Sequence, residues 1–398
     1  MNLNDEMLGL YLNFKIMINN TDNIFDYSKS DEINNINTFI EQSIYLVLKK
    51  DNEIITINEH SEIQTEKDFE QILFGVKKDE EKNTFILINP MPGINILPTE
   101  NNVNYLNHKL WYVINSEPAK ESYNINEDYY LNENDIIKLG NLKYVIKKIN
   151  IDYHKNEHNT KEYKKYNYNI KSINEEIDSI FDFYPLCNNY KNCNFYDSIK
   201  ARLCECKELV EINCIKEWIK NIIQIKENKK VRSYYIKQLI CENCQKTFPI
   251  RFKVKNEDKK YELINIEEFE KEYIILESFY RKVKGEEKLK SIHLISLSNG
   301  DIHIGRRADN DVIEDDNGIS KEHAIISFKK ENGKLLLKNK GRSGTLVLIK
   351  NSIEINKNKI HLQIGKIFIE VCLMKKKDFE VIKNDKTKYP LPDKKNIY

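Results

Sequence analysis

A serine and a histidine stand three residues apart, Ser320 and His323, at the start of the apolar run ISKEHAIISF. Such a pair can serve as nucleophile and general base when a carboxylate orients the imidazole. No Asp or Glu is evidently placed for that task, and no Gly-rich nucleophile elbow surrounds the serine. We therefore assign no catalytic residue and interpret the pair as part of a binding site.

The turns around this pair collect polar and basic side chains between short strands. They are Arg306, Ser320, Lys321, Arg342 and Ser343. A guanidinium supplies a fork of charge-assisted donors and a hydroxyl adds a neutral donor, which together suit a phosphate group. His323 sits instead at the mouth of an apolar strand, where a buried imidazole normally uses its two ring nitrogens to brace loop backbone.

Seven of the eight cysteines fall within residues 187–244, and Cys372 stands alone in an apolar run. In a reducing compartment this clustering favours metal binding over disulfides. Zinc prefers four thiolate or imidazole ligands in a tetrahedron, and two closely spaced cysteines supply two corners from one tight turn. The chain order is Cys187-x5-Cys193, Cys204-x-Cys206, Cys214 and Cys241-x-x-Cys244.

The segments that must position these residues are mainly β. Runs rich in β-branched and aromatic residues, such as SIYLVLKK and KLWYVIN, occupy 39–150, and a second β-rich unit covers 251–380. The cysteine-rich part at 179–250 contains the amphipathic helix ELVEINCIKEWIKNIIQI. The sequence predicts a mainly β, multidomain fold. Its other segments are a weakly ordered or partly helical lead at 1–38, a charged linker at 151–178 and a tail at 381–398.

Charge is balanced over the chain, with 63 Lys and Arg against 62 Asp and Glu in 398 residues. Nucleic-acid binding would need a local basic patch, but Lys-rich stretches such as KVKNEDKK (253–260) also carry acidic residues, which favours solvated surface. No apolar run approaches the roughly 20 residues of a membrane-spanning helix, and the N-terminus lacks the pattern of a secretory signal. We expect a nuclear or cytoplasmic protein without membrane contact.

Three motifs of the second β unit together resemble the forkhead-associated (FHA) domain. They are Gly305-Arg306, Ser320-x-x-His323-Ala324, and Gly344-Thr345 followed by Leu346-Val347. That family is a β-sandwich of two sheets that reads phosphothreonine peptides through its loops. The resemblance implies that Arg306 and Ser320 contact the phosphate. It implies a peptide groove lined by Lys321, Arg342 and Ser343, and a structural role for Gly305, His323, Gly344 and Thr345.

Two positions depart from the family pattern. Gly341 stands where the family usually has Ser, and Ser343 stands where it usually has Asn. That Asn normally contacts the peptide backbone, so the departure bears on peptide affinity and leaves the phosphate pair intact. An FHA fold that binds no phosphate is the alternative.

The cysteine cluster resembles a RING-CH (RING-variant) zinc finger, through its cysteine order, Trp218 in CIKEW and the ending CENCQKTFP. The resemblance implies one complete zinc site formed by Cys204, Cys206, Cys241 and Cys244. A first site is incomplete, because Glu211 stands where a His would be expected; its ligands would be Cys187, Cys193 and Cys214. Glu211 could complete it through oxygen, His154 or His158 could reach in from the linker, or the site holds no metal.

These resemblances lead to two hypotheses. The first is a phosphothreonine-peptide-binding adaptor of signalling, which is not an enzyme and whose finger is a structural zinc module. The second is an E3 ubiquitin ligase that uses the FHA domain to choose phosphorylated substrates, with Trp218 in the groove for a ubiquitin-conjugating enzyme. A Trp on the apolar face of a helix is more often core. Glu211 and the shortened loop before it favour the first hypothesis.

The order of finger, segment 266–281 and FHA unit resembles a multidomain architecture of FHA proteins in single-celled eukaryotes. In that architecture the N-terminal part ends in a stretch like DIIKLG at 135–140. Residues 39–150 are therefore interpreted as a degenerate FHA-like sandwich. Because this segment lacks Gly-Arg and Ser-x-x-His, we assign it no phosphate site.

Overall fold

The computed structural model describes the chain in segments. They are 10–18, 34–38, 44–49, 54–58, 69–79, 84–88, 106, 109–114, 129–151, 171–173, 200–201, 203–204, 206, 210–241, 243–248, 251–254, 260–264, 266–267, 269, 271–282, 288–342, 344–350, 352–355 and 359–375. Within these segments the chain is mainly β, with one helix, α2 (Ile212–Ile222). No described helix is long and apolar enough to cross a bilayer.

Two packed sheets form a C-terminal sandwich. One sheet has the strand order β22-β21-β23-β24-β8, and the other contains the run β20-β18-β10-β9-β25. Apolar side chains of both sheets, among them Ile302, Ile326, Tyr144 and Ile274, meet in one core. The strands are β8 (Tyr129–Leu131), β9 (Ile136–Leu139), β10 (Leu142–Asn150), β18 (Tyr273–Ser278), β19 (Arg281–Lys282, paired with β20), β20 (Lys288–Ser296), β21 (Ile302–Gly305), β22 (Val312–Ile313), β23 (Ala324–Lys329), β24 (Lys334–Asn339) and β25 (Thr345–Leu348).

An N-terminal sandwich has the same plan. One sheet has the order β26-β6-β5-β3-β4, and the other contains the run β7-β27-β28-β1-β2. Strand β7, with the sequence LWYVI, is buried along its whole length because both of its faces meet apolar cores. The strands are β1 (Leu10–Ile18), β2 (Asn34–Thr38), β3 (Ile44–Lys49), β4 (Ile54–Asn58), β5 (Phe69–Asp79), β6 (Thr84–Ile88), β7 (Leu110–Ile114), β26 (Ser352–Ile355), β27 (Lys359–Ile364) and β28 (Ile367–Lys375).

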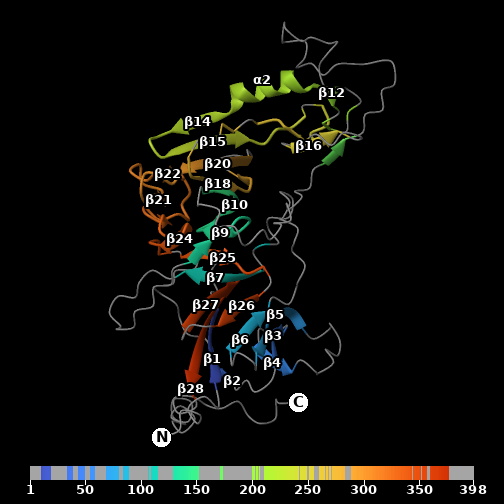
Figure 1. The fold of residues 1–398 in the computed structure, drawn as a ribbon. Coiled ribbons are helices and arrows are strands. Elements are labelled where there is room, and N and C mark those ends of the chain that lie inside the picture. The colour runs from blue at the N-terminus through green and yellow to red at the C-terminus, as the bar shows by residue number, and fades with distance from the viewer. Residues whose placement is uncertain are drawn as a thin grey trace, which may run out of the picture.

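The two sandwiches exchange three strands. In the N-terminal sandwich, β6, β7 and β1 pair with β26, β27 and β28 from the end of the chain. In the C-terminal sandwich, the equivalent strands β24, β25 and β18 pair with β8, β9 and β10. Figure 1 shows green β9 and β10 among the orange strands, and red β28 beside blue β1. Strand β7 also pairs with β25, so the two sandwiches share one sheet.

This strand order differs from the domain boundaries drawn from the sequence. Segments 39–150 and 251–380 each supply strands to both sandwiches, so neither is a separate unit. The prediction of a weakly ordered or partly helical lead at 1–38 is wrong for β1 and β2. The sequence of β1, LYLNFKIMI, has apolar residues at alternate positions, which is the period of a strand, and it pairs with β28 along its length. Within the predicted linker, Lys171–Ile173 forms strand β11.

The cysteine-rich part continues the sheet of the C-terminal sandwich. Strand β15 (Val231–Lys237) pairs with β20 on one side and with β14 (Gln224–Glu227) on the other. Helix α2 lies over β14 and β15 (Figure 1) and packs Ile215 and Ile219 into a second core that includes Leu294 of β20. The remaining strands are β12 (Lys200–Ala201) and β13 (Val210–Glu211), which pair, and β16 (Arg251–Val254) between β11 and β17 (Lys260–Glu262).

Candidate functional site

Loops at one end of the C-terminal sandwich bring the predicted phosphate residues together. Arg306 directly follows β21, and Ser320 precedes β23. The two segments run side by side, because the Arg306 amide donates to the Ser320 carbonyl at 3.0 Å and the Arg307 amide donates to the Lys321 carbonyl at 3.1 Å. Backbone hydrogen bonds therefore fix the relative position of the guanidinium-bearing and hydroxyl-bearing loops.

His323 ties three loops together from beneath. The side chain is fully buried, and its Nδ1 accepts a hydrogen bond from the Ser320 amide at 3.0 Å. Its Nε2 lies 3.0 Å from the Gly344 carbonyl, which can only accept, so Nε2 carries the ring proton. The His323 carbonyl accepts from the amides of Lys340 and Gly341, both at 2.8 Å. Burial lowers the pKa of His323, which keeps the ring in the neutral form that this pattern requires.

Two glycines allow the loops to approach this closely. A Cβ at Gly305 would lie 2.4 Å from the Lys321 carbonyl oxygen. A Cβ at Gly341 would lie 2.8 Å from the Ser320 Oγ and 2.9 Å from the His323 Nδ1. Gly341 is one of the departures from the family pattern, and in this chain a side chain at that position would press its Cβ against Ser320 and the His323 ring. The Gly341 departure therefore fits this local packing.

The basic side chains of the site reach solvent. Arg306, Lys321 and Arg342 are exposed, and Ser320 is half-buried. The Arg306 Nη1 lies 3.5 Å from the Asn317 Oδ1, a long contact that leaves most of the guanidinium donors free to bind a ligand. Ser343 lies outside the described residues. The arrangement presents one fork of charged donors and one hydroxyl on neighbouring loops.

Sequence reasoning missed two side chains that hold these loops. Asn310 donates through Nδ2 to the carbonyls of Arg307 and Lys321, at 2.8 and 2.7 Å, and so links the loops that carry Arg306 and Ser320. Asn339 accepts through Oδ1 from the Gly341 amide and from the Thr345 hydroxyl. An Asn in a turn commonly forms hydrogen bonds to nearby backbone, so the position of each Asn within a tight loop could have predicted this role.

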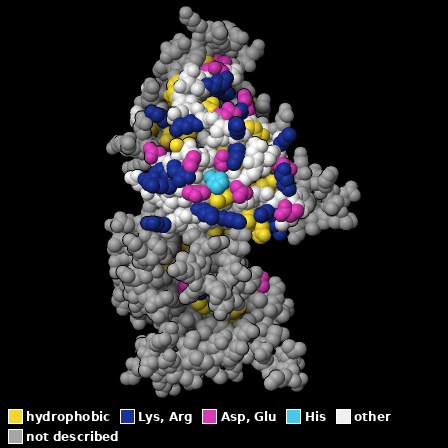
Figure 2. All heavy atoms as spheres, turned by 90° about the vertical axis from the view of Figure 1, so that its left-hand side faces the viewer, with side chains coloured by type: hydrophobic (Ala, Val, Ile, Leu, Met, Phe, Trp, Pro, Cys, Tyr) yellow, Lys and Arg dark blue, Asp and Glu magenta, His cyan; other side chains and the backbone are white. Residues whose placement is uncertain are grey.

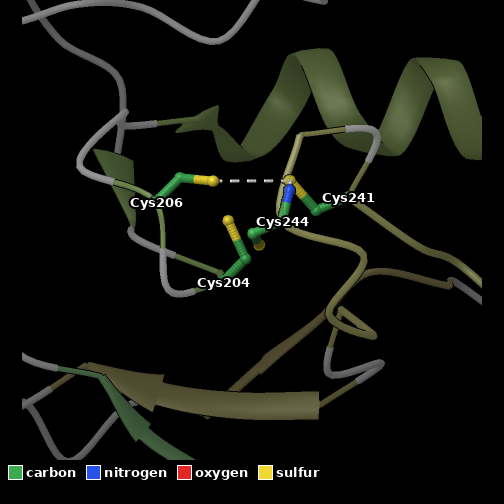
Figure 3. A group of neighbouring side chains, drawn as sticks. All are labelled: Cys204, Cys206, Cys241 and Cys244. Atoms are coloured by element: carbon green, nitrogen blue, oxygen red, sulfur yellow. Dashed lines mark hydrogen bonds between the residues drawn. The ribbon is translucent and has the colours of Figure 1, made fainter.

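Four cysteines meet at a second location, under the N-terminal end of α2 (Figure 3). They are Cys204 and Cys206, from the loop between β12 and β13, and Cys241 and Cys244, from the turn after β15. Their sulfurs all lie within 4.8 Å of one another, and Cys206 and Cys241 are 3.7 Å apart. The turn is closed by the Gln245 amide, which donates to the Cys241 carbonyl at 2.9 Å.

The donor set and spacing fit zinc. A tetrahedron with Zn–S bonds of about 2.3 Å has edges of about 3.8 Å, close to the measured pair. Burial raises the pKa of Cys204 to about 11, and a hydrogen bond with Cys244 raises the pKa of Cys206. A divalent cation would reverse both shifts, because it binds and stabilises thiolates. The Cys244 amide, 3.5 Å from the Cys241 Sγ, is placed to donate to such a thiolate.

The structure describes only part of the expected first zinc site, because Cys187 and Cys193 lie outside the described residues. Cys214 and Glu211 are both buried, with the Cys214 Sγ 3.2 Å from a Glu211 carboxylate oxygen. That distance suits a hydrogen bond from a thiol, but Cys214 is disulfide-bonded, and a disulfide sulfur has no proton to donate. The prediction of Cys214 as a zinc ligand is therefore wrong, because a disulfide sulfur cannot act as a thiolate ligand, while the other ligands of the first site stay a prediction. Trp218 is half-buried and packs against the core beneath α2.

Comparison with known proteins agrees with the loop geometry. Residues 302–369 match the FHA domain family. The matched stretch begins at β21, contains the loops that carry Arg306 and Ser320, and ends within β28. Its last strands, β26 to β28, belong to the N-terminal sandwich in the structure, so the matched sequence is divided between the two sandwiches. Neither a curated protein nor a solved structure matches the chain.

Proposed function

We propose that this protein is a phosphothreonine-peptide-binding adaptor, and that Arg306 and Ser320 bind the phosphate. One observation carries the proposal: within the FHA domain, the loop of the exposed Arg306 is hydrogen-bonded to the loop of Ser320, whose own amide is held by the buried His323. Arg306 would supply a bidentate, charge-assisted contact and Ser320 a single neutral donor. Lys321 and Arg342, both exposed, would contact the peptide on either side, together with Ser343.

The charge of the surrounding surface suits a short peptide. Figure 2 shows the face on which β21, β22 and β24 lie, with Lys and Arg side chains interspersed with Asp and Glu. A long polyanion is bound by an unbroken basic stripe, whereas one phosphate needs a local cluster only. The mixed surface around the site therefore favours a phosphorylated protein segment as the partner over nucleic acid.

The test is calorimetric titration of the full chain with phosphothreonine peptides and their unphosphorylated counterparts. Arg306→Ala removes the fork and should weaken binding by about 1.5–3 kcal/mol, while Ser320→Ala should cost about 0.5–1.5 kcal/mol. Arg307→Ala is the matched control, since Arg307 is also exposed but pairs with Asp309 at 2.5 Å. Equal losses from Arg306→Ala and Arg307→Ala would show that net charge, and not a phosphate contact, is responsible. Wild-type protein that binds both peptide forms equally would refute the proposal.

We further propose that the four cysteines hold one structural Zn²⁺. Support comes from four sulfurs within 4.8 Å of one another, carried by two turns on either side of α2 in the sequence. The ligase alternative has weaker support. It requires Trp218 as a surface contact for a ubiquitin-conjugating enzyme, and this side chain packs against the core instead. Metal content of the purified protein, measured beside an autoubiquitination assay, distinguishes a structural zinc module from a ligase.

A further inference from the structure

A fully buried carboxylate, Glu314, lies just after β22 and inside the C-terminal sandwich. Its Oε2 accepts from the Arg281 Nη2 at 2.7 Å. Its Oε1 lies 2.9 Å from the His293 Nε2 and accepts from the Ser291 hydroxyl at 3.0 Å. Burial raises the pKa of Glu314, but the hydrogen bond from His293 and the charges of His293 and Arg281 outweigh burial and lower it to about 2. Glu314 is therefore ionised and bonded on both oxygens.

The groups that hold Glu314 belong to the opposite sheet. Arg281 lies on β19, and Ser291 and His293 lie on β20. Strand β15 supports the same place, since the Ser233 Oγ lies 2.8 Å from the His293 Nδ1 and the Tyr235 hydroxyl donates to the Ile313 carbonyl at 3.0 Å. These contacts attach the segment around Glu314 to β15, β19 and β20 of the opposite sheet.

Glu314 begins the loop that ends at Ser320. Its amide donates to the Gly305 carbonyl at 3.1 Å, directly before Arg306, and its carbonyl accepts from the Asp316 amide at 3.1 Å. Asp316 in turn accepts the Gly318 amide on its side chain and the Ile319 amide on its carbonyl, at 2.8 and 3.0 Å. A series of hydrogen bonds thus runs from Glu314 to Ile319, the residue directly before Ser320.

We infer that Glu314 is a positioning residue for phosphopeptide binding: its buried contacts with Arg281 and His293 fix the loop 314–320, and with it Ser320 beside Arg306. This inference rests on the proposed function. Glu314 cannot touch a ligand itself, because its side chain is fully buried behind the loop. Its effect is to keep the loop in the binding-competent arrangement, and the apparent dissociation constant rises in proportion to any loss of that arrangement.

The distances also allow a second interpretation, a hydrolytic triad of Ser233, His293 and Glu314. The burial of all three side chains excludes this interpretation. The three side chains are 5%, 1% and 0% exposed, so no substrate can reach the serine. The network is therefore assigned to support of the loop.

The test compares two buried carboxylates in the full chain. Glu314→Gln removes the charge that Arg281 pairs with, and Glu277→Gln is the matched control. Glu277 is 6% exposed and pairs with Lys290 at 2.6 Å and Lys147 at 3.3 Å, on strands that do not carry the phosphate loop. Ser291→Ala is a milder second variant, for use if Glu314→Gln does not fold. The measurements are melting temperature, phosphothreonine-peptide affinity and amide hydrogen exchange.

We expect both glutamine variants to lower the melting temperature, because each removes a buried carboxylate charge that a neighbouring cation pairs with, Arg281 in one case and Lys290 in the other. Only Glu314→Gln should also weaken phosphopeptide binding, by about tenfold if a tenth of the loops remain competent, and speed amide exchange across 305–320. Equal exchange and equal affinity in the two variants would overturn the inference. Failure of wild type to prefer phosphorylated peptide would refute the proposed function alone, because exchange across 305–320 would still show whether Glu314 positions the loop.

Discussion

Two fragments of the chain should distinguish the strand-exchanged fold from a fold in which each sandwich is formed by one continuous stretch of sequence. A fragment of residues 251–380 contains the whole FHA match but lacks β8 to β10. A fragment of residues 129–350 lacks β26 to β28 but contains every strand of the C-terminal sandwich. If the strands are exchanged as the structure shows, the second fragment should fold and bind phosphopeptide, whereas the first should not.

The stability that fragment 251–380 loses can be estimated from the side chains that β8 to β10 place in the core of the C-terminal sandwich. Six of them are at most 5% exposed: Leu131, Ile137, Leu139, Leu142, Tyr144 and Ile146. At about 1.5–3 kcal/mol for each buried side chain, their loss amounts to roughly 9–18 kcal/mol. This is an upper estimate, because unfolded chains bury some apolar surface, but it is comparable to the whole stability of a domain, about 5–15 kcal/mol. Fragment 251–380 should therefore be unfolded.

Circular dichroism melting curves of both fragments, followed by peptide titration, provide the assay. The expected result is a cooperative transition for 129–350 and none for 251–380. A folded 251–380 that binds peptide as tightly as the full chain, beside an unfolded 129–350, would refute the exchange and place β26 to β28 in the C-terminal sandwich.

Three further predictions concern single residues. His323→Gln should lower the melting temperature more than it lowers peptide affinity. The difference in stability from wild type should shrink below about pH 6.5: burial lowers the pKa of His323, so wild type loses the stability that the neutral ring contributes as the pH falls. Melting curves from pH 5 to 8 check this. Gly140→Ala should disturb the phosphate loop, since a Cβ there would lie 2.0 Å from the Gly318 oxygen; peptide affinity reports it. Cys241→Ser should remove the proposed zinc, which metal analysis would show as a fall from one ion per chain.

Local features of this molecule can be read from the sequence. The FHA motifs identify a domain that the family match confirms, and the mainly β fold is confirmed by the structure. Both rest on short-range signals: paired Ser320 and His323 at a strand entrance, and period-2 apolar runs. Helix α2 is predictable for the same reason, because its apolar residues recur at helical spacing.

Long-range pairing cannot be read from such signals. The stretches DIIKLGNLKYVIKKI and IHLQIGKIFIEVCL have similar alternation and a similar Gly turn, so the local pattern does not show which sandwich each one completes. Which one pairs with β18 depends on contacts between strands far apart in sequence. The role of Glu314 is hidden in the same way, because its partners Arg281 and His293 belong to strands whose position the local pattern does not specify.

The exchange also has a consequence for the order in which the chain folds. Strand β1 pairs with β28, with Leu10 opposite Lys375, and β6 and β7 pair with β26 and β27, so during synthesis β1, β6 and β7 emerge well before these partners. At about 5–20 residues per second the delay exceeds roughly ten seconds. Strands β8 to β10 are the next to emerge after β7, and they can pair first with β6, β7 and β1 in the positions that β26 to β28 hold in the folded protein. Release of β8 to β10 from that position should then limit the folding rate of the full chain. Fragment 129–350 lacks β1, β6 and β7, so it should refold faster.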